Sequence, residues 1–135
     1  MNNQITIPFT VTLWDVKPFD DAPNSPTLMR GTVKKTFDGE FKGESTGEVL
    51  MYSAADGSAG YTIMDKVSGE LRGRAGSFVM MHGATHTPEE TSRAGGIIAP
   101  NSGTGELRGI SGTVEFKSDE NGKSIILDFA FADEN

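Results

Sequence analysis

The sequence predicts an all-β protein, an eight-stranded antiparallel meander closed into a small barrel. Apolar and polar residues alternate with a period of two in several segments, as they do in strands with one buried face. The 17 glycines among 135 residues are spread along the chain and separate these segments, which is typical of strands joined by tight turns. No long window carries a helical apolar stripe free of glycine and proline. Closure into a barrel removes exposed sheet edges, and the length suits one domain over residues 1–135.

The first expected strand covers 4–16. Every second residue from Ile5 to Leu13 is apolar, the residues between them are mostly threonines, and Trp14 continues the threonine-rich face. Pro8 cannot donate to a ladder and therefore marks an edge or a bulge. Three prolines predict a loop over 17–26.

The other strands are expected from the same alternation and from turn signals between them. They cover 28–38, 40–53, 58–67, 76–82, 91–100, 110–118 and 123–133. Residues 55–57 and 119–122 have the composition of hairpin turns. The best helical stretch, 88–93, is one turn at most, with Pro88 at its first position.

A short motif occurs three times along the chain. Gly-Glu-Leu-Arg-Gly at 69–73 recurs at 105–109, and Gly-Glu-Phe-Lys-Gly at 39–43 is a weaker copy. We expect the central Leu or Phe to plug one end of the barrel, with the flanking glycines at positive φ. Two good copies are too few for a solenoid.

The composition excludes several classes of function. A net charge of −7 argues against a nucleic-acid partner. The absence of cysteine excludes disulfides and thiolate chemistry, and it fits the cytoplasm. No apolar run is long enough to span a membrane, and the first residues lack the features of a signal peptide. We therefore expect a cytoplasmic protein with no membrane partner and no cofactor.

A family resemblance rests on stretches that together reach from about 5 to 131. They are Leu-Trp-Asp-Val-Lys-Pro-Phe-Asp at 13–20, Thr-Phe-Asp-Gly-Glu-Phe-Lys-Gly-Glu-Ser-Thr-Gly-Glu at 36–48, Asp-Gly-Ser-Ala-Gly-Tyr at 56–61, Ser-Phe-Val-Met-Met-His at 77–82 and Gly-Thr-Gly-Glu-Leu-Arg-Gly-Ile-Ser-Gly at 103–112. As a combination they resemble a bacterial family of small uncharacterised proteins, a domain of unknown function, whose architecture is similar to the allene oxide cyclase barrel. The resemblance implies an eight-stranded antiparallel barrel with a central cavity. It implies no established activity.

Asp65 is one candidate pocket residue, because its strand face is otherwise mostly apolar. Tyr61, Ile63 and Val67 share that face, and an acid among apolar neighbours is more informative than an acid on a polar face. Glu48 is a second candidate, since Leu50 follows on its own face. The alternative for Glu48 is that its face is solvated.

His82 ends the strand over 76–82 and could act as an acid, a base or a group that orients a ligand. The alternative is a hydrogen-bonded histidine at the barrel mouth. His86 completes an H-x-x-x-H spacing, but glycine, threonine and proline around it predict a loop, so we expect no metal site. Trp14, the single tryptophan, either walls a cavity or plugs the barrel.

If Glu48, Asp65 and His82 point into one cavity, they come from successive strands and lie side by side. One of the two carboxylates would then have a raised pKa, and so would His82. Tyr61 and Trp14 complete the candidate ligand pocket, with Trp14 at its mouth.

Three functions are compatible with this pattern. A barrel of eight strands can hold one small apolar or amphipathic ligand. The same pocket could instead serve an isomerase, cyclase or hydrolase, and a filled barrel would leave a structural or interaction protein. We favour binding. The strand over 123–133 is apolar on both faces, which predicts a homo-oligomer, most simply a dimer.

Overall fold

The computed structural model describes residues 3–132, apart from the side chains of residues 91–93. Within this range the chain forms nine strands and no helix. They are β1 (Asn3–Asp20), β2 (Thr27–Asp38), β3 (Phe41–Ser53), β4 (Ala59–Leu71), β5 (Arg74–Thr87), β6 (Glu90–Ile98), β7 (Thr104–Gly105), β8 (Ile110–Asp119) and β9 (Gly122–Phe131).

Eight of these strands form a closed antiparallel ring. Their order is β4-β3-β2-β1-β9-β8-β6-β5, and β5 pairs with β4 to complete the circle. The predicted barrel-like meander is confirmed. The ninth strand, β7, is a two-residue segment in the connection from β6 to β8 that pairs with the start of β5.

The first strand differs from the prediction in two ways. It extends to Asp20, so the expected loop begins later than residue 17. Its register against β2 shifts between Val11 and Leu13, which leaves Thr12 as an extra residue. A bulge of this kind moves all later side chains to the opposite face. Trp14 is therefore paired with Val33 on the inner face, and its assignment to the threonine-rich face was wrong.

The expected helical turn near residue 88 is also absent. Glu90 already belongs to β6, and residues 88–89 form the turn between β5 and β6. Glu90 pairs instead with Thr87 across this turn.

One end of the barrel is closed by a packed apolar core. The central residues of the three repeated motifs, Phe41, Leu71 and Leu107, are almost completely buried in it. Their expected role as plugs is confirmed. Of the flanking glycines, Gly73, Gly105 and Gly109 have positive φ, but those of the first motif and Gly69 do not. Gly43 and Gly69 are instead cross-strand partners in β3 and β4. Glycine is required at both positions because a side chain would overlap the backbone of the facing strand.

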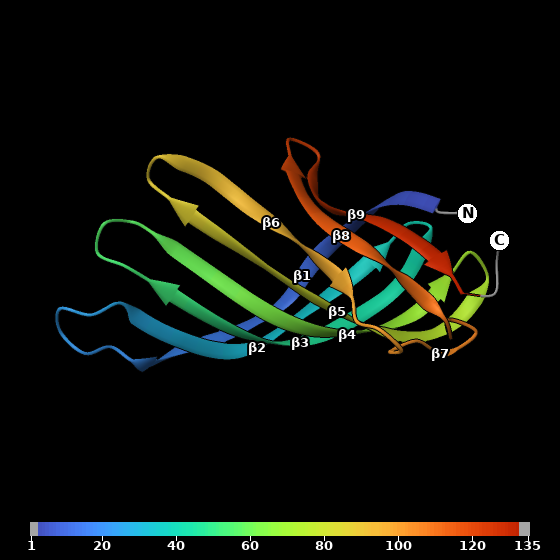
Figure 1. Cartoon of the computed structure of the whole chain (residues 1–135), viewed down its shortest axis with the longest axis horizontal. Coiled ribbons are helices and arrows are strands. Elements are labelled where there is room, and N and C mark those ends of the chain that lie inside the picture. The colour runs from blue at the N-terminus through green and yellow to red at the C-terminus, as the bar shows by residue number, and fades with distance from the viewer. Residues whose placement is uncertain (1–2, 133–135) are drawn as a thin grey trace.

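The opposite end of the barrel is open. The hairpins β1–β2, β3–β4 and β5–β6 extend well beyond the β8–β9 hairpin (Figure 1). β9 pairs with β1 only as far as Phe9, and β8 pairs with β6 only over residues 95–97. The outer halves of β1 and β6 therefore have no strand between them, and the ring is open on this side.

Candidate functional site

A cavity of about 580 Å³ occupies this open end. Its walls are mostly apolar and aromatic, and they come from every strand of the ring. The lining residues include Phe9, Val11, Trp14, Val33, Val49, Tyr61, Ile63, Ala84, Ala94 and Phe116. A concave, apolar pocket of this size is typical of small-molecule sites.

The floor of the cavity carries three polar side chains that bind one another. Lys35 from β2 donates to Asp65 Oδ2 over 2.7 Å, and His82 Nε2 from β5 lies 2.6 Å from the same oxygen. The exposed fractions are 5% for Lys35, 0% for Asp65 and 7% for His82. Burial of ionisable groups is costly unless they are paired, and this arrangement pairs them.

Cross-strand register brings these groups together. Asp65 on β4 lies opposite Gly47 on β3, and the missing side chain at Gly47 leaves room for the carboxylate. His82 lies opposite Ile63, which is two residues before Asp65 on β4 and faces inward with it. The ring of His82 therefore reaches the carboxylate diagonally.

The electrostatics of the floor favour an ionised Asp65 beside a neutral His82. Burial raises the pKa of Asp65, but the hydrogen bond from His82 and the charge of Lys35 outweigh it, and the pKa lies below its ordinary value. Burial is also the largest influence on His82 and lowers its pKa, with Lys35 adding to the effect and Asp65 opposing it. The expected increase in the pKa of His82 is therefore wrong, because desolvation of the imidazolium exceeds its attraction to one carboxylate.

These protonation states fix the histidine tautomer. An ionised carboxylate can only accept hydrogen bonds. Nε2 of neutral His82 therefore carries the ring proton and donates a hydrogen bond to Asp65. Nδ1 is then a bare acceptor. Burial also raises the pKa of Tyr61, and the charge of Asp65 adds to this, so its hydroxyl stays protonated.

The floor also contains buried polar atoms without partners. Among the described residues that are not exposed, the buried side-chain atoms lacking a hydrogen bond are Ser45 Oγ, Asp65 Oδ1 and His82 Nδ1. Ser45 lies on β3 directly opposite Lys35, so all three belong to one neighbourhood. Unpaired buried groups are rare in folded proteins, and a cluster of them marks a place where water or a ligand can bind.

We expect the free energy of unfolding to fall as the pH is lowered below about 6.5, the ordinary pKa of histidine. The pKa of folded His82 is lowered, so below pH 6.5 the unfolded chain takes up a proton that the folded chain does not. The loss is at most about 1.4 kcal/mol per pH unit, and Asp65 adds a second loss below its ordinary pKa of 3.8.

Urea unfolding between pH 7.5 and 5 measures this slope. His82→Gln should flatten it, whereas His86→Gln, which changes an exposed histidine of the same strand, should preserve it. Equal slopes in wild type and His82→Gln would show that His82 titrates normally in the folded protein.

The structure brings together four of the five predicted pocket residues. Asp65 and His82 form the floor with Tyr61 beside them, its ring 6.0 Å from that of His82. Trp14 lines the mouth and is 57% exposed, so it walls the cavity and does not plug the barrel.

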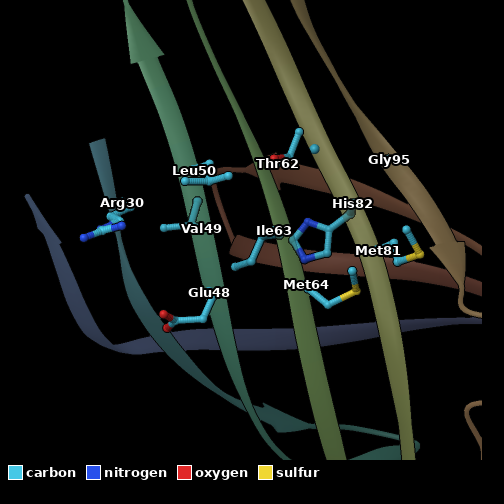
Figure 2. Close-up of a pocket in the computed structure, with 11 residues that line it drawn as sticks. Arg30, Glu48, Val49, Leu50, Thr62, Ile63, Met64, Met81, His82 and Gly95 are labelled. Carbon is cyan, nitrogen blue, oxygen red and sulfur yellow. The ribbon is translucent and has the colours of Figure 1, made fainter. Parts of the chain in front are cut away.

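Glu48 is the exception. It lies on the exposed outer face of β3, because its neighbour Gly47 faces Asp65, and it accepts a 2.6 Å hydrogen bond from Thr32. Figure 2 shows its carboxylate directed away from His82. The predicted inward orientation of Glu48, and with it the pair of neighbouring carboxylates, is wrong.

Lys35 is the member of the floor that sequence reasoning missed. It shares a strand face with Val33 and Phe37, so it is a charge on an apolar face. This is the same signal that identified Asp65. A long side chain can usually extend to solvent, which hides this signal in a lysine.

A second hollow of about 660 Å³ lies over β3, β4 and β5 (Figure 2), and its lining shares Val49, Ile63 and His82 with the cavity. Met64 and Met81 are cross-strand partners there, Ile97 continues the row, and Leu50 lies beside it, all four being exposed. The expected dimer stays a prediction. This patch is a better candidate for its interface than Ile126 of β9, which is already partly buried.

His86 is exposed at the end of β5, in a strand and not in the expected loop. The described residues contain no group of three or more His, Asp or Glu side chains placed to hold a metal ion. They also contain no helix long and apolar enough to cross a membrane.

Fold and site together define a small antiparallel β-barrel with one open end, an apolar cavity and a buried ionic floor. The profile of a family described as a protein of unknown function (DUF3224) matches residues 5–131. The chain belongs to this family, as the sequence resemblance indicated.

A crystal structure from the same family, of a protein of unknown function from Shewanella oneidensis MR-1, is similar over nearly the whole chain. The two sequences are 32% identical, the TM-score is 0.84, and the match covers 97% of this chain and 98% of that one. No curated protein matches the chain.

Proposed function

We propose that this protein binds a small apolar or amphipathic molecule in the cavity at the open end of the barrel. The observation that carries the proposal is the cluster of unpartnered buried atoms beneath an apolar cavity. The closed end of the barrel is filled by packed apolar side chains, which leaves no comparable space there. The open end is free to exchange one ligand.

Trp14 provides the readout for this proposal. Octan-1-ol titrated into the protein should shift its fluorescence to the blue, because Trp14 is exposed at the mouth and a bound alkyl chain would cover it. Native mass spectrometry of protein purified from its host tests for a retained molecule of the same class.

Ala84→Leu should abolish the shift, since Ala84 lines the cavity opposite Ala94 and a larger side chain would fill it. Thr85→Leu is the matched control, because the next residue along β5 is exposed. An absent shift, or one that Ala84→Leu leaves unchanged, would overturn the proposal.

A second candidate function is proton transfer by an isomerase-type mechanism. Neutral His82 donates a hydrogen bond from Nε2 to Asp65 and leaves Nδ1 unpartnered. This is the arrangement of a general base held by a carboxylate. Phe116 packs against the face of the ring, with centroids 4.5 Å apart, and helps to hold the imidazole in place. Deuterium uptake by a retained ligand in heavy water, lost in His82→Gln, would distinguish this function from binding alone.

A further inference from the structure

The charged side chains that line the cavity are all cationic. Among the described residues they are Lys35, Lys117 and Lys123, in a chain whose net charge is −7. Within the floor, Lys35 and His82 reach the cavity, whereas Asp65 is completely buried beneath them. The wall that a ligand meets is therefore positive, although the protein is acidic.

The three lysines differ in how far their charge is compensated. Lys35 is paired with Asp65 at 2.7 Å, and Lys117 has Asp119 at 3.6 Å near the surface. Lys123 has no ion pair among the described residues. Its charge is available to a ligand.

Lys123 is also well placed to meet a ligand. It is paired with Phe9 across β1 and β9 and with Ser118 across β8 and β9. Phe9 packs against the core, so Lys123 lies on the inner face of β9, at the end of the strand that borders the mouth. The lysine thus faces the rim of the cavity, with apolar walls below it.

We infer that the ligand is an organic anion with an apolar body, whose anionic group Lys123 binds at the rim. The inference rests on the proposed binding function and names the chemical class of the ligand. The apolar body extends inward between Trp14 and Ile63, and Ser118, the cross-strand partner of Lys123, lies beside the anionic group. A carboxylate, sulfonate or phosphate head would satisfy this chemistry equally well.

Three probes of eight carbon atoms each test the inference: octanoate, octan-1-ol and octylammonium. Trp14 fluorescence gives the dissociation constant of each. Octanoate should bind about fivefold more tightly than the alcohol, the scale of one partly exposed ion pair, and octylammonium should bind more weakly than either. High salt should reduce the preference for octanoate and leave binding of the alcohol unchanged.

Lys123→Gln should bring the ratio of octanoate to octan-1-ol affinity close to one. Lys66→Gln removes the same charge from an exposed position of β4 and should leave the ratio unchanged. Octyl sulfonate and octyl phosphate then rank the anionic heads.

The possible failures are distinguishable. Equal affinities for octanoate and octan-1-ol in the wild type would overturn the anion inference and leave the binding function intact. Loss of the preference for octanoate in Lys66→Gln as well would show that the preference follows the net charge of the protein, and would overturn the role of Lys123. Binding of no probe would overturn both proposals.

Discussion

Asp65→Asn is expected to lower the free energy of unfolding by about 3–5 kcal/mol, a large part of the stability of a domain this size. Asp65 is completely buried and accepts hydrogen bonds from both Lys35 and His82. Asparagine keeps the shape of the side chain but removes its charge, which leaves the ammonium of Lys35 buried without a counter-charge. Urea unfolding at pH 7.5 measures the loss.

The double variant Lys35→Met/Asp65→Asn separates the charge effect from packing. It removes both charges at similar volume and should recover most of the stability lost in Asp65→Asn. Asp128→Asn, outside this network, should cost little. A loss below about 1 kcal/mol in Asp65→Asn, or no recovery in the double variant, would mean that the ion pair does not hold the floor together.

Gly47→Ala is expected to destabilise the barrel by about 2–4 kcal/mol and to disrupt the floor of the cavity, because it forces a side chain into filled space. A Cβ at position 47 would overlap Asp65 Oδ1 and would lie 2.9 Å from Ile63 Cδ1. The backbone of Gly47 has no positive φ, so the effect comes from space and not from conformation. The carboxylate would have to move away from Lys35 and His82.

Gly39→Ala is the matched control, since the nearest atom to its added Cβ is Pro8 Cδ at 3.2 Å, far from the floor. A double-mutant cycle with Asp65→Asn gives the coupling. The two effects should be strongly non-additive, because both variants break the same contacts. Additive effects would show that the cost of Gly47→Ala does not come from displacing the carboxylate of Asp65.

Alternation of apolar and polar residues was sufficient to predict the fold. The strands of the ring follow segments with a period of two, and the repeated motifs plug the closed end as expected. Sequence spacing could not reveal the bulge at Thr12, because one extra residue leaves the local pattern of alternation almost unchanged. That bulge decides which face Trp14 occupies.

The amino-acid sequence was enough to predict an antiparallel barrel and to make Asp65 and His82 candidates for its interior. Local alternation carries that information, because each strand must bury one of its two faces. Only the folded arrangement of the strands reveals that Lys35 is the partner of Asp65, that Glu48 faces outward, and that His82 is neutral. Pairing register across strands sets which side chains meet, and burial in three dimensions sets their charge, so neither property is written in the spacing of residues along one strand.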